Sequence, residues 1–169
     1  MKVLKILLIS ALFLEGSSGL TARPPQKFNV PAGWMATETY GLAGRWKTPK
    51  SPFPTVDLFV RSLDKKFSIK KKEVPKFIGV VQSLRSSTLQ SAGITDFKFQ
   101  KFNLVDRGGK STLIKLTGSY KVKTKVVYFK EWQHYIGKTY YQLTYTSLTP
   151  ISGDTADQVL NKFQTVVKR

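Results

Sequence analysis

The sequence predicts an α+β protein in which an antiparallel sheet is covered by a C-terminal amphipathic helix. From Thr95 to Ser147 β-forming residues dominate and are interrupted by short turns, and the residues from Asp154 on carry an apolar stripe at helical spacing. Because an antiparallel sheet needs a cover for its apolar face, we expect this helix to pack on it. The length of 169 residues fits a single domain.

The first 19 residues are predicted to be a secretory signal peptide. Lys2 and Lys5 form a positive n-region, Ile6 to Leu14 is an apolar stretch of nine residues, and small residues precede a cleavage point after Gly19. Nine apolar residues are too few to span a bilayer, which needs about 20. The alternative is an uncleaved anchor or a first helix of the domain, and Glu15 with the Gly/Ser run argues against it. We therefore expect an exported protein, located in a periplasm or outside the cell.

A linker and then one domain are predicted after the leader. Residues 20–27 contain Pro24-Pro25 and are expected to be extended, and the domain is expected to cover residues 28–169. Its first two strands are predicted to be short, at Phe28 to Pro31 and at Arg45 to Lys47.

A longer strand and a helix are expected next. Val56 to Leu63 is dense in β-forming residues. Pro75 fits a first helical turn, and apolar residues then recur at helical spacing as far as Arg85. The spacing predicts a helix from Pro75 to Arg85.

The region that follows is predicted to be an antiparallel meander. Its strands are expected at Phe97 to Phe102, Thr112 to Tyr120, Val126 to Tyr135 and Thr139 to Ser147, joined by short turns. Apolar and polar residues alternate in the second of these strands, so one of its faces is expected to be apolar.

The C-terminal helix is the most clearly patterned element. Asp154 is placed to cap it, Asp157 suits its positive first turn, and basic residues occupy its negative end. Its apolar stripe consists of Ala156, Val159, Leu160, Phe163, Val166 and Val167. We expect the stripe to face the sheet, and not a membrane or a partner.

The composition excludes several classes of protein. There is no cysteine and only one histidine, His134, which rules out disulfide scaffolds, cysteine zinc sites, thiol nucleophiles and a lipidated N-terminal cysteine. With 28 Lys and Arg against 10 Asp and Glu, the formal net charge is +18. An apolar fraction of 41% is enough for a core and argues against a disordered basic tail.

No catalytic constellation emerges from the acids. They fall singly, whereas a glycosidase needs two carboxylates on one bond and a metal nuclease needs several around a cation. Glu131 and His134 should point to opposite faces of a strand, and we interpret them as an exposed Glu and a hydrogen-bonded His. Gly108 to Ser111 echoes a phosphate-binding loop but precedes a strand, so a hairpin turn is expected. The sequence thus predicts no enzyme, no metal site and no cofactor.

Three motifs resemble those of the PsbP-like and DcrB-like proteins: a Phe-x-Val-Pro-x-Gly-Trp opening, a Gly-turn hairpin rich in Tyr and Thr, and the final helix with an aromatic in its last turns. Their residues are Phe28, Val30, Pro31, Gly33, Trp34, Gln133, Gly137, Lys138, Tyr140, Tyr141, Leu143, Thr144, Tyr145, Thr146 and Phe163. The resemblance covers residues 28–168. It implies an α/β/α sandwich with a central antiparallel sheet, in exported accessory proteins without common catalytic residues. This chain departs from the DcrB-like lipoproteins in lacking a lipidation cysteine after its predicted signal, and from the photosynthetic members in showing no visible transit peptide.

Lysine dominates the positive charge and is clustered. One group lies ahead of and inside the first predicted helix and consists of Lys65, Lys66, Lys70, Lys71, Lys72 and Lys76. A second group consists of Lys121, Lys123 and Lys125 in a turn of the meander, with Lys115 behind them. We predict that these ten lysines bind an anion or a partner. The alternative is that they are solvated positions that discourage strand aggregation, but the total charge exceeds what solubility needs.

These features lead us to expect a monomeric, non-catalytic accessory protein. It would dock through its lysine-rich surface onto an anionic envelope component or an acidic protein partner, with peripheral membrane contact as one form of docking. One alternative is nucleic-acid binding through exposed aromatics such as Tyr128, Trp132 and Tyr140, which export and the scarcity of arginine make less favourable. The other is a small-molecule or lipid carrier with an aromatic-lined cleft.

Overall fold

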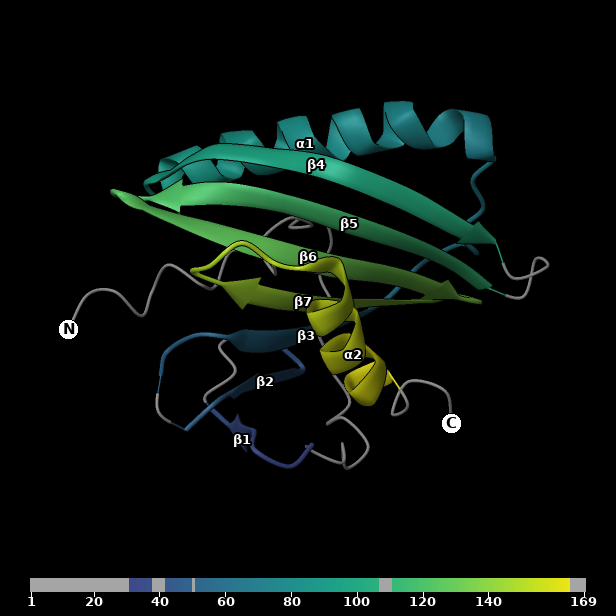
Figure 1. The fold of residues 1–169 in the computed structure, drawn as a ribbon. Coiled ribbons are helices and arrows are strands. Elements are labelled where there is room, and N and C mark those ends of the chain that lie inside the picture. Colours follow the sequence, from purple (N-terminus) through teal and green to yellow (C-terminus); the bar gives the residue numbers. More distant parts are fainter. Residues whose placement is uncertain (1–30, 38–41, 50, 107–110, 165–169) are drawn as a thin grey trace.

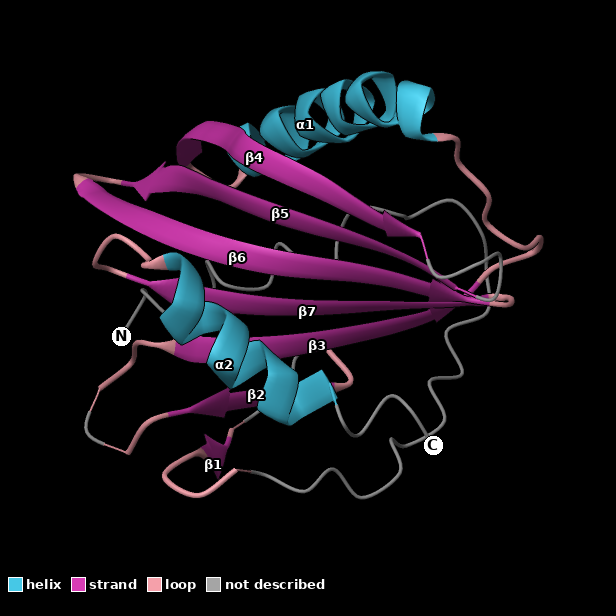
Figure 2. Ribbon diagram, turned by 45° about the vertical axis from the view of Figure 1, so that its right-hand side comes forward, coloured by secondary structure: helices cyan, strands magenta, loops and turns pink. Residues whose placement is uncertain are grey.

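The structure is a computed structural model that describes residues 31–37, 42–49, 51–106 and 111–164. These residues form one seven-stranded antiparallel sheet with a helix on each face, as Figure 1 and Figure 2 show. The predicted α/β/α arrangement is confirmed. The predicted signal peptide, the linker, the turn at 107–110, and Val166 and Val167 of the C-terminal stripe lie outside the described residues.

The strands follow one another in a simple order along the chain. They are β1 (Met35–Ala36), β2 (Gly44–Lys47), β3 (Thr55–Ser62), β4 (Ile94–Asp106), β5 (Ser111–Val122), β6 (Lys125–Ile136) and β7 (Thr139–Ser147). In the sheet their order is β1-β2-β3-β7-β6-β5-β4, and every neighbouring pair is antiparallel. The predicted meander is therefore confirmed as β4 to β7, and the N-terminal strands extend the sheet past β7.

The first helix, α1 (Val74–Ser91), follows a short 3-10 turn, η3 (Lys71–Glu73), and lies on the β4 side of one face of the sheet (Figure 1). It continues past the predicted end at Arg85. The reason is tertiary: Leu89 is buried, and the Ser86 hydroxyl donates a hydrogen bond of 3.3 Å to the Phe97 carbonyl of the edge strand β4. These contacts outweigh the weak helix propensity of the Ser and Thr residues in the last turns.

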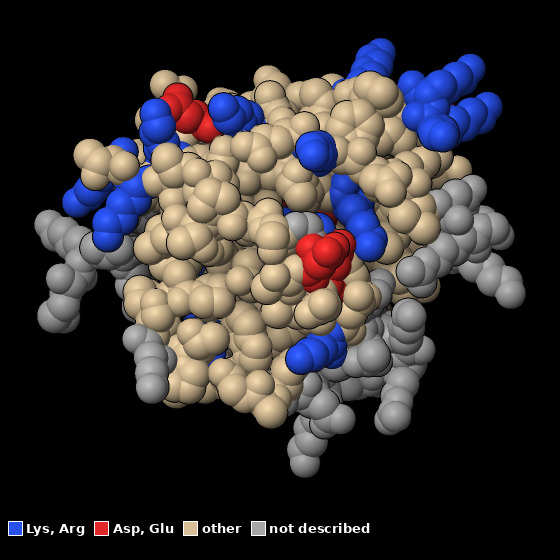
Figure 3. Space-filling view, viewed as in Figure 1, with Lys and Arg blue, Asp and Glu red and all other residues tan. Residues whose placement is uncertain are grey.

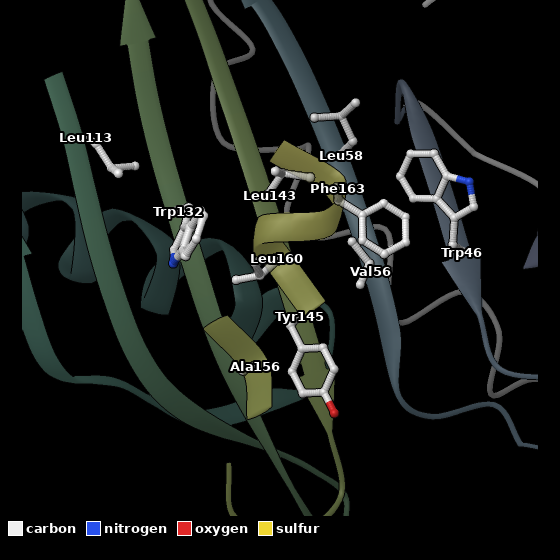
Figure 4. Close-up of a cluster of buried hydrophobic side chains, with 10 residues drawn as sticks. All are labelled: Trp46, Val56, Leu58, Leu113, Trp132, Leu143, Tyr145, Ala156, Leu160 and Phe163. Atoms are coloured by element: carbon white, nitrogen blue, oxygen red, sulfur yellow. The ribbon is translucent and has the colours of Figure 1, made fainter. Parts of the chain in front are cut away.

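The second helix, α2 (Gly153–Gln164), lies on the opposite face, across β7 and β3 (Figure 2). Asp154 lies in its first turn and not at the predicted capping position, because the helix already begins at Gly153. The predicted stripe is confirmed where it is described, since Ala156, Leu160 and Phe163 are buried in the cluster of Figure 4. The Phe163 ring lies 5.0 Å from that of Trp46. Burying each of the larger side chains stabilises the fold by about 1.5–3 kcal/mol.

The α1 face has its own apolar cluster, and one glycine is required in it. Ile114 and Leu116 of β5 are fully buried there, which confirms the predicted apolar face of that strand. Two residues further along β5, Gly118 lies where a Cβ atom would overlap the Phe129 ring and the Lys98 carbonyl oxygen. Only glycine lets β4, β5 and the Phe129 ring approach one another this closely.

Candidate functional site

The segment between β3 and α1 is held on the sheet by two apolar side chains that lie between its two runs of lysines. Phe67 stacks on Tyr135 of β6 with ring centroids 3.8 Å apart, and Ile69 packs against the same apolar cluster. The lysines on either side of this pair, Lys66 and Lys70, are exposed. The apolar anchors thus fix an irregular segment whose lysines face the solvent.

The 3-10 turn places more lysines around the N-terminus of α1. The Glu73 carboxylate accepts a hydrogen bond of 2.9 Å from the Lys70 N–H, and the Glu73 N–H donates to the Lys70 carbonyl at 2.8 Å. The turn leads directly into α1, so Lys71, Lys72 and Lys76 surround the start of the helix, and all three are exposed. Cations are unfavourable at the positive end of a helix dipole, so helix stability does not explain them.

A further lysine reaches the same end of the sheet from another part of the chain. The Leu63 N–H donates a 2.7 Å hydrogen bond to the carbonyl of Lys138, in the turn between β6 and β7. Sequence reasoning missed Lys138, because only the β3–β7 pairing brings it here. We call this surface the basic end; it consists of Lys65, Lys66, Lys70, Lys71, Lys72, Lys76 and Lys138. Its main segment, residues 64–76, holds six lysines against two acids, Asp64 and Glu73.

The second predicted group is smaller and partly neutralised. Lys121, Lys123 and Lys125 are exposed around the β5–β6 turn, and we call them the turn cluster. Lys121 forms an ion pair of 2.7 Å with Asp96. The hydrogen bond from Lys121 holds the pKa of Asp96 below its usual value.

The basic end and the turn cluster are not one patch. The basic end surrounds the first turn of α1. The turn cluster lies at the other end of this helix, because β4 starts close behind the last turn of α1 and Ile94 at its start pairs with Val122, beside the turn cluster. The 18 residues of α1 separate the two by about 27 Å. Figure 3 shows the corresponding blue atoms at the upper right and at the left. Because the Debye length is about 8 Å at physiological salt, the two groups act independently.

Lys115 belongs to neither group. Its Nζ lies 4.2 Å from the ring centroid of Trp132 and 3.9 Å from the Asp157 carboxylate of α2. The same carboxylate accepts a 2.7 Å ion pair from Lys130. The structure therefore places Lys115 in the packing of α2 on the sheet, and not behind the turn cluster as predicted.

Beneath α1 lies a buried polar cluster that the sequence did not predict. Glu131 is 1% exposed, so its interpretation as an exposed residue is wrong. Arg85 donates to both of its carboxylate oxygens, at 2.7 and 2.8 Å, and Gln133 and Gln142 donate to them at 2.6 and 3.0 Å. Burial alone would lower the pKa of Arg85, but Glu131 raises it above its usual value. With both oxygens engaged, Glu131 is not available as a general acid or base.

The remaining sequence-based candidates are core residues, except Tyr128, which is half-buried. His134 is buried, and strand alternation turns it to the face opposite Glu131, as predicted. Trp132 and Tyr140 are 2% and 6% exposed, so the prediction that they are exposed aromatics for base stacking is wrong. Among the described residues no group of three or more His, Asp and Glu side chains could hold a metal ion.

Two buried tyrosines beside this polar cluster, Tyr135 and Tyr140, are expected to make the protein less stable in alkaline solution. Burial, and then the nearby Glu131 charge, raises the pKa of Tyr135, and burial is also the main reason why the pKa of Tyr140 is raised. In the unfolded chain both tyrosines ionise near pH 10. Above about pH 10 the native state therefore binds more protons than the unfolded state, and the free energy of unfolding falls by up to about 2.7 kcal/mol per pH unit for the pair. Urea unfolding at a series of alkaline pH values checks this. Tyr135→Phe/Tyr140→Phe is expected to flatten the slope, and an unchanged slope would contradict the assignment.

No protein-family model matches the chain, and no curated protein matches it significantly. Among solved structures, the solution structure of cyanobacterial PsbP (CyanoP) from Synechocystis sp. PCC 6803 matches with a TM-score of 0.55, over 90% of this chain and 95% of that chain. The fold is PsbP-like. The sequence identity is 13%, so the likeness to CyanoP establishes the fold alone. It confirms the PsbP-like sandwich that the sequence resemblance implied.

Proposed function

We propose that this protein is a non-catalytic, exported accessory protein that docks through its basic end onto an anionic envelope component or an acidic protein partner. The observation that carries the proposal is the convergence of seven exposed lysines from the β3–η3 segment, the start of α1 and the β6–β7 turn. A lysine close to an anionic surface contributes about 1 kcal/mol, so a group of this size suffices for reversible attachment.

The type of base supports docking by general electrostatic attraction. The chain has six arginines, and two of them, Arg45 and Arg85, are buried in ion pairs with Asp57 and Glu131. The basic end consists of lysines, which attract an anion without the bidentate geometry that an arginine supplies. Mobile lysine side chains suit a surface of many anionic groups better than one precisely shaped ligand.

The state of the acids supports a non-catalytic role. Asp57 accepts two hydrogen bonds from Arg45, at 2.6 and 2.9 Å, and Glu131 is fully engaged below α1. Asp96 and Asp157 are ion-paired with lysines. Each of these four carboxylates is thus already engaged by a basic side chain.

Export is supported by the predicted leader. In the part of the chain that the structure describes, no helix is long and apolar enough to cross a membrane.

Binding of the full chain to anionic surfaces tests the proposal. We expect salt-sensitive binding to vesicles that contain phosphatidylglycerol or to immobilised polyglutamate, and weak, salt-insensitive binding to phosphatidylcholine vesicles. Any contribution of the apolar leader is present with both kinds of vesicle, so the difference between them reports the charge. Absence of salt-sensitive binding to either anionic material would overturn the proposal.

A further inference from the structure

The exposed side of α1 is unusual for a helix that faces water. The helix contains no Asp or Glu. Its exposed residues include Val80 and Leu84, which are 52% and 58% exposed, and otherwise Lys76, Pro75 and small or uncharged residues. A helix of a soluble domain normally carries charged and polar residues on this side.

The exposed apolar residues continue the basic end along the helix. Lys76, Val80 and Leu84 are spaced four residues apart, so their side chains form one row on the helix surface, and Lys72 of η3 precedes the row. We call these four residues the α1 ridge. It passes from exposed lysines at the basic end to exposed aliphatic side chains one and two turns further on. In Figure 3 the blue atoms at the upper right adjoin an uncharged surface along the top, where Figure 1 draws α1.

The contacts of α1 with the sheet orient the helix so that this ridge faces the solvent. Arg85 and Leu89 are buried against the sheet. On another side of the helix, Gln82 accepts from the Phe99 N–H at 2.8 Å and Ser86 donates to the Phe97 carbonyl at 3.3 Å. These anchors leave the ridge on the side that faces neither the sheet nor β4.

We propose that the α1 ridge docks on an anionic lipid bilayer, with Lys72 and Lys76 at the headgroup phosphates and Val80 and Leu84 in the interface. This inference rests on the proposed function and names its target. The aliphatic stems of lysines suit such a boundary because their charged ends stay among the headgroups. Each lysine near the surface contributes about fivefold to partitioning, and the apolar side chains add contacts that a soluble polyanion does not offer.

A bilayer fits the ridge better than an acidic protein does. A stable protein interface buries about 800 Å² per partner and depends on aromatic or arginine anchors. The exposed residues of α1 include no aromatic residue and no arginine. Two aliphatic residues beside lysines are a weak protein interface, but they match the shallow insertion of an interfacial helix.

The test compares two double variants of the full chain. Val80→Ser/Leu84→Ser removes the apolar part of the ridge, and Met35→Ser/Leu148→Ser is the matched control, because those residues are 44% and 38% exposed but lie outside α1. We expect the ridge variant to partition about tenfold less onto phosphatidylglycerol-containing vesicles. The control should change by no more than about twofold.

A second measurement reports insertion directly. The chain has no cysteine, so Leu84→Cys can carry a single environment-sensitive dye, with Leu148→Cys as its control. We expect the dye at position 84 alone to shift to shorter emission wavelength when phosphatidylglycerol-containing vesicles are added.

The outcomes separate this inference from the proposed function. If binding is salt-sensitive but the two double variants bind vesicles equally, the ridge is not a lipid surface and the proposed function stands. Equal weakening of the ridge variant on polyglutamate and on vesicles would assign the ridge to an acidic protein partner and overturn the inference. No salt-sensitive binding to either material would overturn both.

Discussion

Replacing Glu131 by alanine is expected to lower the free energy of unfolding by about 3–5 kcal/mol. The substitution leaves the Arg85 guanidinium buried beneath α1 without the carboxylate that accepts two of its hydrogen bonds. It also removes acceptors from Gln133 and Gln142. Urea unfolding followed by circular dichroism measures the loss.

Two controls make this prediction specific. Arg85→Met/Glu131→Leu removes both charges and is expected to recover much of the lost stability, because no uncompensated charge remains buried. Asp64→Ala removes an exposed acid and should change stability by less than about 0.5 kcal/mol. If Glu131→Ala lowers the free energy of unfolding by less than about 1 kcal/mol, the buried ion pair does not stabilise the packing of α1 on the sheet.

Replacing Lys70, Lys71 and Lys72 together by glutamine is expected to weaken binding to anionic vesicles by about a hundredfold, from three lysines at about fivefold each. Replacing Lys121, Lys123 and Lys125 is expected to weaken it much less. The turn cluster lies about 27 Å away, beyond the Debye length, and Lys121 is already paired with Asp96.

The two triple variants are matched controls for each other, because both lower the net charge by three. Co-sedimentation with vesicles at a series of salt concentrations compares them, and the Lys70/Lys71/Lys72 variant should also show the shallower salt dependence. Equal losses would mean that binding follows net charge and not the basic end.

Local sequence patterns predicted the helices and strands that are visible in the residue types and spacing of the sequence itself. Strand β5 alternates apolar and polar residues, β6 and β7 are dense in β-forming residues, and the buried stripe of α2 recurs at helical spacing. The end of α1 was missed because its last turns are stabilised by the burial of Leu89 and by the hydrogen bond from Ser86 to β4, which local helix propensity does not reflect.

The candidate site was predicted only in part, because some of its residues come together only through contacts between distant parts of the chain. The lysines near η3 are contiguous in the sequence, but Lys138 joins them only through the pairing of β3 with β7. Arg85 and Glu131 are 46 residues apart, and neither is unusual alone. One local signal existed: Arg85 lies seven residues after Ile78 and four before Leu89, on the buried side of α1, where an unpaired charge is not tolerated.

The buried ion pair between Arg85 and Glu131 lowers the entropy cost of docking at α1. The helix is already fixed on the sheet before a partner arrives, so its backbone entropy was lost during folding and is not lost again on docking. In the proposed docking, only the rotamers of exposed side chains, the lysines and the aliphatic residues of the α1 ridge, would become restricted. The surface is therefore preorganised, and in the bilayer docking proposed above the lysines would keep much of their side-chain freedom because each would contact many headgroups in turn. Such a surface favours rapid, reversible attachment over long residence.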